Sequence, residues 1–448
     1  MTALRRAATP GALLVLLVAC AAARAQSAPP APATDPSTVA IVHARLYTLE
    51  TAEPLEDATV VIRDGRVQRV GRGLAPPAGA SVVDAGGRTV TPGLMTAGTQ
   101  IGLVEIGSLP DTRDHTLGSG TLGAAFDVQY GINPNTTLRT LALADGLTRA
   151  LLHPEGSPVT PFMGQAALLR LAPATGMLER ARVAMFVRAG TGAATGAGGS
   201  RSAAWILLRN ALEEARRYRP SATGVGAPRD QLLGRLDAEA LAPVVAGRMP
   251  LAIVADRESD IRQAIALHDE TRLPVLIYGG AEAWRLAAEL ASRRIPVVVD
   301  PTLNLPASFD TMGARADNAA RLRAAGVPVA FSVSAFHRSW NAGSGLRLGA
   351  GLAVANGLPW IEALRAMTTV PAAMFGLGQR YGRVAPGYDA DLVIWDGDPL
   401  EPSTSALRVW VRGVEVPLAD TRQRELARRY APEAMKSELP AGYRWGRD

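Results

Sequence analysis

Apolar and polar positions alternate over short stretches in the first part of the chain, and this pattern predicts a small sheet. The alternation runs through residues 39–48, 58–62, 67–70 and 81–84. A period of two places the apolar side chains on one face of a strand. Asp64 and Gly65 separate two of these stretches and are typical of a hairpin turn. We therefore expect a small antiparallel sheet between residues 38 and 90.

From residue 92 onward, short apolar runs alternate with longer helical patterns. Strand-like runs cover residues 149–153, 182–187, 251–255, 274–278, 296–299 and 328–333, and helical patterns cover 202–218, 259–271, 281–293 and 314–325. Strands and helices in alternation predict a parallel sheet, here closed as a barrel. The stretch 189–200 is rich in glycine, alanine and threonine and predicts a mobile loop, because it lacks the lysine and the glycine spacing of a phosphate-binding loop.

The last part of the chain returns to strand patterns after a helix around residues 359–374. The new strands cover residues 391–395 and 407–411, with a turn at Arg412 and Gly413. These strands need partners outside the barrel, so we expect them to complete the sheet begun by residues 38–90. The predicted fold is α/β: a (β/α)8 TIM-like barrel over 92–377, a composite β-sandwich from 38–91 and 378–420, and a C-terminal extension over 421–448.

The N-terminal segment has the pattern of an export signal. Arg5 and Arg6 precede an apolar run over residues 11–23, and small residues end at Ala25. A run of about a dozen residues is too short for a stable membrane span. We expect cleavage of residues 1–25, a flexible lead-in over 26–37, and a periplasmic protein without a transmembrane span. In the alternative, residues 17–20 form a lipobox and the mature chain is lipid-anchored through Cys20, the only cysteine.

Composition restricts the function further. Of 448 residues, 48% are hydrophobic and 20% are charged, so the chain can bury a large core. The net charge is +6, yet the basic residues are scattered, and we expect no nucleic-acid binding. Almost all of them are arginine, because Lys436 is the only lysine.

Two segments at the ends of the expected barrel carry a family resemblance. Residues 90–95 (VTPGLM) look like the entry to the first barrel strand of the amidohydrolase superfamily, and residues 382–396 (GRVAPGYDADLVIWD) resemble its closing signature. Residues 132–134 (INP) and 154–156 (PEG) are similar to the imidazolonepropionase-like branch. The resemblance implies a distorted (β/α)8 barrel with a composite β-sandwich, and hydrolysis by water that one or two divalent cations activate.

The positions at which the resemblance implies metal ligands hold other residues. The two histidines at the end of the first strand fall on Gly98 and Gln100, and a later histidine falls on Tyr278. The aspartate after the last strand, which is also the usual general base, falls on Ser334. The bridging lysine of many members is excluded, because Lys436 lies beyond the barrel. We therefore expect degenerate metal positions and no metal cofactor, with zinc only under an alternative remodelled site.

Polar residues remain at the C-terminal ends of the expected strands, the face where barrel enzymes bind their substrates. These candidates are His153, Asp256, Tyr278, Asp300 and His337. We interpret His115 as a solvated loop residue, and His43 and His268 as structural. A new metal site built from His115, His153 and His337 fits no known ligand spacing and is the weaker hypothesis.

Three functions stay open at this point. The first is a non-catalytic protein that binds a small molecule in the barrel pocket, or pairs with a related amidohydrolase as a homo- or hetero-oligomeric subunit. The second is a hydrolase of amide, cyclic amide or ester bonds. It would use a shifted metal, or a metal-free pair such as His153 with Asp256 or Asp300. The third is a scaffold anchored in the cell envelope.

Overall fold

The computed structural model describes residues 35–118, 120, 122–172, 176–219, 232–333 and 340–418. The predicted export signal with Cys20, most of the lead-in, the C-terminal extension with Lys436, and the candidates Ser334 and His337 lie outside the described residues. Within the described ranges no helix is both long and apolar enough to cross a membrane.

The larger sheet is a nearly closed barrel, as the alternating pattern predicts. Its strands follow one another in chain order: β6 (Leu94–Thr99), β7 (Leu147–Leu152), β8 (Phe162–Arg170), β9 (Leu178–Arg188), β10 (Leu251–Ala255), β11 (Val275–Gly279), β12 (Val297–Val299) and β13 (Val329–Phe331). Strands β6 and β13, at the two ends of this order, contact each other. The expectation of a purely parallel sheet is wrong at β8, which runs antiparallel to both β7 and β9. Residues 153–161 alone join β7 to β8, fewer than the roughly dozen residues that a parallel crossover needs.

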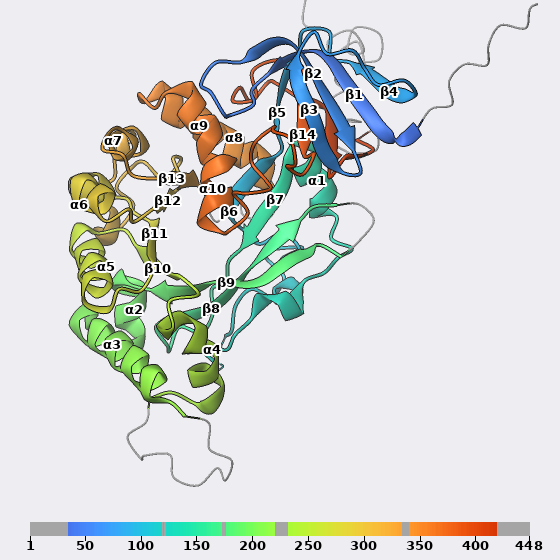
Figure 1. Cartoon of the computed structure of the whole chain (residues 1–448). Coiled ribbons are helices and arrows are strands. Elements are labelled where there is room, and N and C mark those ends of the chain that lie inside the picture. Colours follow the sequence, from blue (N-terminus) through green and yellow to red (C-terminus); the bar gives the residue numbers. More distant parts are fainter. Residues whose placement is uncertain are drawn as a thin grey trace, which may run out of the picture.

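Helices surround this barrel (Figure 1), and all of them lie outside it except α10, which packs against residues of the barrel interior. They are α1 (Leu138–Ala144), α2 (Gly190–Gly196), α3 (Arg201–Arg217), α4 (Arg235–Val245), α5 (Glu258–Thr271), α6 (Ala287–Ser292), α7 (Asn318–Ala324), α8 (Ala342–Ala355), α9 (Trp360–Ala366) and α10 (Thr369–Met374), with short 3-10 helices at Pro110–Thr112, Val128–Gly131, Ala283–Leu286 and Phe309–Thr311. The prediction of a loop over 189–200 is wrong for α2. The carboxylate of Asp310 accepts the Thr191 N–H at 2.7 Å, and Ala193 and Ala194 are buried. These tertiary contacts stabilise a helix that the composition does not favour.

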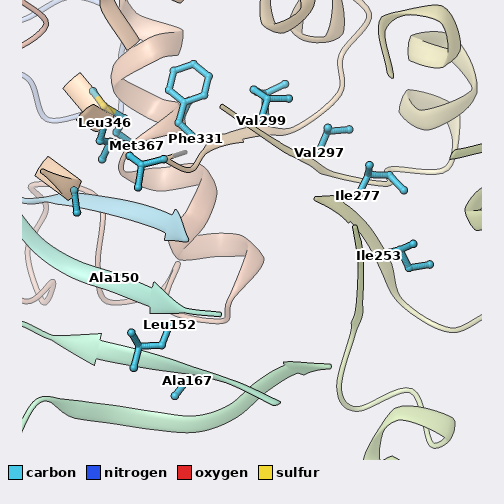
Figure 2. Close-up of a cluster of buried hydrophobic side chains, with 14 of the residues drawn as sticks. Ala150, Leu152, Ala167, Ile253, Ile277, Val297, Val299, Phe331, Leu346 and Met367 are labelled. Atoms are coloured by element: carbon cyan, nitrogen blue, oxygen red, sulfur yellow. The ribbon is translucent and has the colours of Figure 1, made fainter. Parts of the chain in front are cut away.

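Alternate residues of the barrel strands point to opposite sides and form two separate hydrophobic clusters. The outward residues pack under the helices, and Figure 2 shows Ile253, Ile277, Val297 and Val299 among them. The inward residues include Ala252, Leu276, Tyr278, Val298 and Ala330. The barrel interior is therefore a packed core, and any site must lie at its open end.

The second sheet is assembled from both ends of the chain, as the sequence predicts. Its strands are β1 (Asp35–Leu46), β2 (Leu55–Arg63), β3 (Arg66–Arg72), β4 (Ala80–Asp84), β5 (Thr89–Pro92), β14 (Leu392–Trp395), β15 (Ala406–Val411) and β16 (Val414–Glu415). Strand β14 pairs with β5 and joins the two chain ends. The expectation of an antiparallel arrangement over residues 38–90 is wrong in part, because β4 and β5 run parallel to β1. The chain crosses from β3 to the other edge of β1 before β4 begins, so β4 points the same way as β1.

A buried arginine joins the barrel to the second sheet. Arg149 of β7 is fully buried, and its guanidinium contacts Asp391 and lies 3.3 Å from the Asp389 carboxylate. Its Nε lies 2.6 Å from Oε2 of Glu179 in β9. The ring of Tyr381 lies 5.0 Å from the guanidinium carbon. The two aspartates of the segment GYDADLV thus hold the two sheets together, since removing one partner of a buried ion pair costs several kcal/mol.

Candidate functional site

The C-terminal ends of β10, β11, β12 and β13 surround a pocket with a cavity volume of about 200 Å³. Three of the predicted candidates, Asp256, Tyr278 and Asp300, line it together. Sequence reasoning missed the other polar lining residues, which include Asn318 and Ser332. Apolar lining comes from Val254, Ala281, Val299, Leu303, Leu305 and Val333. We call this the C-terminal pocket, and we call residues 300–317 the pocket loop.

His153 lies beside this pocket in an aromatic cluster. Its ring stacks on Phe186 with centroids 5.6 Å apart and lies 5.5 Å from the ring of Tyr278. Phe186 and Tyr278 meet edge to face at 5.2 Å. His153 is only 2% exposed and does not line the C-terminal pocket. Tyr278 is therefore the residue that connects the cluster to the pocket. His337 lies outside the described residues, so its placement relative to His153 stays a prediction.

Tyr278 occupies the space in front of Gly98. A Cβ atom built on Gly98 would lie 1.9 Å from the Tyr278 hydroxyl and 3.3 Å from Cβ of Ser332. A side chain at position 98 is therefore incompatible with Tyr278 as it lies here. The end of the Tyr278 side chain thus lies directly against the first barrel strand.

Gln100 takes part in a second polar group at this end of the barrel. Its Nε2 donates a hydrogen bond to Oε1 of Glu155 at 3.0 Å, and Oε2 of Glu155 lies 3.5 Å from Nε2 of His115. The interpretation of His115 as a solvated residue is wrong, because it is only 7% exposed. Its loop packs against the segment after β7, where the Glu155 N–H donates to the His115 carbonyl at 2.8 Å. Arg188 at the end of β9 fixes the same segment through the Glu155 and Ser157 carbonyls.

The carboxyl group of Asp256 is largely buried and carries a perturbed pKa. Burial raises its pKa to about 6, and the nearby charges of Asp310 and Glu282 act in the same direction. One hydrogen bond, from the Ala281 N–H to Oδ1 at 3.2 Å, works against this shift. Glu282 accepts hydrogen bonds from the backbone N–H groups of Glu258 and Gly313, both at 2.8 Å. A carboxyl group with a pKa near neutrality in a pocket marks a candidate functional residue.

The other polar residues of the C-terminal pocket are held by local hydrogen bonds. Oδ1 of Asp300 accepts the N–H of Thr302 at 2.9 Å and its hydroxyl at 2.6 Å. Nδ2 of Asn318 donates to the Gly280 carbonyl at 2.9 Å. Asn318 stands at the start of α7, and only its position in the folded chain identifies it as a pocket residue.

Two predicted structural histidines lie away from the pocket. His43 in β1 is exposed and contacts Asp84 at 3.1 Å. His268 in α5 is hydrogen-bonded to the Leu273 carbonyl at 2.8 Å. Among the described residues, no group of three or more His, Cys, Asp or Glu side chains is arranged to hold a metal ion. The hypothetical site of His115, His153 and His337 includes a residue outside the described ranges and stays a prediction.

Comparisons with known proteins agree on one family. A family model described as the amidohydrolase family matches residues 262–417. Imidazolonepropionase of Cereibacter sphaeroides is 26% identical over 397 residues, covering 77% of this chain and 89% of that protein. An amidohydrolase of Hapsidospora irregularis is 47% identical over 57 residues, and this chain covers only 6% of that protein. The crystal structure of an amidohydrolase from Thermotoga maritima superimposes with a TM-score of 0.75 at 25% identity, covering 84% of this chain and 99% of that chain.

Proposed function

Because the chain belongs to the amidohydrolase superfamily, we propose that it binds a small molecule in the C-terminal pocket of the family's barrel, without the family's metal centre. The observation that carries the proposal is the position of Tyr278. Its hydroxyl lies where a ligating side chain at position 98 would begin, 1.9 Å from a Cβ built there. The barrel end therefore accommodates an aromatic ring in place of an imidazole ligand.

The donor set gives the same indication. Gly98 has no side chain, and the amide of Gln100 is a weak ligand that already donates to Glu155. Tyr278 packs against His153 and Phe186 in an arrangement of three rings. An apolar, aromatic surrounding is suited to packing and does not provide the two or three anionic or imidazole donors that a divalent cation needs. These residues do not fit the metal, so we derive no catalytic step through it.

Metal analysis tests the proposal directly. The chain purified without chelators should contain well below one equivalent of zinc, manganese, nickel or iron. Its unfolding midpoint should be unchanged by a chelator or by added Zn²⁺, because a ligand that binds the native state raises its stability. The variant His43→Ala controls for adventitious binding to an exposed imidazole. Stoichiometric metal that survives this substitution, with a midpoint that falls on chelation, would contradict the proposal.

A second candidate function is metal-free hydrolysis of an amide, cyclic amide or ester bond, and the pair His115–Glu155 favours it. A carboxylate 3.5 Å from one ring nitrogen can orient an imidazole as a general base. The other ring nitrogen, Nδ1 of His115, is buried and has no hydrogen-bond partner among the described residues. The pair differs from the predicted ones, since His153 lies in the aromatic cluster and outside the C-terminal pocket.

The hydrolase function makes its own prediction. Turnover of an activated ester such as p-nitrophenyl acetate should fall in His115→Gln and in Glu155→Gln, and His268→Gln should serve as the matched control. General-base catalysis typically contributes about 10²–10⁴-fold to a rate. Turnover equal in all three variants and in the unaltered chain would exclude His115 as the base. Turnover absent from the unaltered chain supports the binding function.

Two further proposals concern the setting of the protein. We propose that residues 1–25 direct export to the periplasm, with Cys20 as an alternative lipid anchor. We also propose assembly with a second copy or with a related amidohydrolase subunit. Protease accessibility in spheroplasts and light scattering of the purified chain test them separately.

A further inference from the structure

Two side chains of the C-terminal pocket, those of Asp256 and Asn318, are held by the turn that ends β11. Asp256 packs over this turn, where its Oδ1 accepts the Ala281 N–H at 3.2 Å. Asn318 binds the same turn, because its Nδ2 donates to the Gly280 carbonyl at 2.9 Å. Gly279 has φ +99°, and a Cβ there would lie 2.6 Å from Oδ1 of Asp256, so only glycine allows this approach.

One oxygen of each of these side chains has no hydrogen-bond donor among the described residues. Among the described residues no group donates to Oδ2 of Asp256, whose side chain lines the pocket. Asn318 is 8% exposed, and its Oδ1 is buried without a hydrogen-bond partner in the described part of the chain. Nδ2 of Asn318 already donates to the Gly280 carbonyl, so the atom without a partner among the described residues is the acceptor, Oδ1. A buried polar atom without a partner costs about 1–3 kcal/mol, which a bound donor would recover.

The charges around the pocket favour a cation. Asp256 and Asp300 both line it, and Glu282 lies close enough to raise the pKa of Asp256. Asp310 acts in the same direction, although its own charge is paired with Arg201. Arg315 is the positively charged lining residue among those described, and both its Nε and one terminal nitrogen bind Asp317, at 2.6 and 2.9 Å. Tyr278 adds an aromatic ring at the inner end, which also attracts cations.

The mouth of the pocket is apolar. Leu303 and Leu305 of the pocket loop line it and are 62% and 74% exposed. Exposed leucines gain free energy when a ligand covers them, at about 25 cal/mol per Å² of buried apolar surface. The volume of about 200 Å³ is below the roughly 300–1,000 Å³ of pockets that hold drug-sized ligands. The ligand is therefore small, with a polar end inside and an apolar end at the mouth.

We propose that the C-terminal pocket binds a small organic cation whose nitrogen carries at least two N–H donors, an amidinium or a primary ammonium attached to an apolar group. One donor binds Oδ2 of Asp256 and another binds Oδ1 of Asn318, while Leu303 and Leu305 cover the apolar group. This inference rests on the proposed binding function and adds the ligand class.

Three probes of nearly equal shape test the ligand class: benzamidine, benzamide and benzoate, titrated calorimetrically at pH 8. Benzamidine should bind at least about tenfold more tightly than benzamide, and benzoate should not bind, because a charged donor strengthens hydrogen bonds to a carboxylate. Asp256→Asn should weaken benzamidine binding by roughly 10- to 100-fold, and Asn318→Ala by about tenfold. Asp111→Asn removes a carboxylate that does not line the pocket and should change nothing.

The unaltered chain offers a test that does not depend on a variant. Benzamidine should bind the ionised carboxylate of Asp256, so its affinity should fall by about tenfold per pH unit below pH 6. Equal affinities for benzamidine and benzamide, or benzamidine binding insensitive to both Asp256→Asn and pH, would overturn the ligand class. If none of the three probes binds and the protein contains no metal, the ligand class is also overturned. The proposal that the site is metal-free would then still stand. Stoichiometric metal would instead count against the proposed function.

Discussion

Asp256 should destabilise the folded protein at neutral pH, and its replacement by asparagine should therefore stabilise it. Burial raises the pKa of Asp256 from 3.8 to about 6. A group that ionises less readily in the folded state binds a proton there over a pH range in which the unfolded chain has lost it. Folding stability consequently falls as the pH rises from about 4 to about 6. At 1.4 kcal/mol per pH unit, the loss reaches about 3 kcal/mol above pH 7.

The variant Asp256→Asn removes this loss and keeps the local geometry. The asparagine oxygen can still accept the Ala281 N–H that Oδ1 accepts now. Equilibrium urea denaturation of both proteins between pH 4.5 and 8 measures the difference in unfolding free energy. We expect a small difference at pH 4.5, growth up to about pH 6, and a plateau of at most about 3 kcal/mol.

Asp317 provides a control of opposite sign. Hydrogen bonds from Arg315 and Arg321 lower its pKa, so its charge stabilises the folded state above the pKa of the unfolded chain, and this contribution is lost as the pH falls. Asp317→Asn should therefore be destabilising at pH 7, and the difference from the unaltered protein should begin to shrink as the pH falls below about 4. If Asp256→Asn is less stable than the unaltered protein at pH 7, or differs from it by a constant amount at every pH, the reasoning about Asp256 is refuted.

Three other substitutions test separate parts of the structure. Gly98→Ala should cost about 1–3 kcal/mol through overpacking against Tyr278, and a double-mutant cycle with Tyr278→Phe should recover part of that cost, because the hydroxyl makes the closest contact. Arg149→Met should cost about 3–5 kcal/mol in urea denaturation at pH 7, because it leaves buried carboxylates without their partner. The cost should be smaller at pH 4, because burial raises the pKa of Asp391 and favours its neutral form, and an equal cost at both pH values would contradict the ion-pair explanation. Asp310→Asn should speed amide hydrogen exchange in the pocket loop, because Asp310 accepts the Thr191 N–H and binds Arg201 at 2.5 Å. Unchanged exchange would show that other contacts hold the loop.

The regular part of the fold follows from local patterns. Alternation of period two and helical period identify most barrel strands and their helices, because each pattern depends only on which face is buried. Strand β8 breaks the expectation of a parallel sheet, since direction depends on the length of the connection after β7 and not on the strand's own residues. Helix α2 was missed for a related reason. Its glycine-rich sequence has low helix propensity, and Asp310, distant in sequence, binds its first turn.

The candidate site was predictable only where a residue stands next to a strand end. Asp256, Tyr278 and Asp300 do so, and the structure brings them into one pocket. Asn318 begins a helix, and nothing in its local sequence connects it with the turn at Gly280. Glu155 lies in a short motif, but its contact with His115 depends on a loop that returns to the barrel.

The contacts of the closing signature, residues 382–396, show what holds this part of the fold together. Asp389 and Asp391 bind the buried Arg149, so the segment that identifies the family fastens the second sheet to the barrel and does not itself form the pocket. Tyr278 packs against the rings of His153 and Phe186 beside the C-terminal pocket. Under the proposed metal-free function, these two arrangements would hold the fold without a bound ion. Asp256 differs from these stabilising contacts, because a buried carboxyl group with a raised pKa destabilises the folded state. A group that costs stability and faces a pocket is best explained by a ligand that it binds.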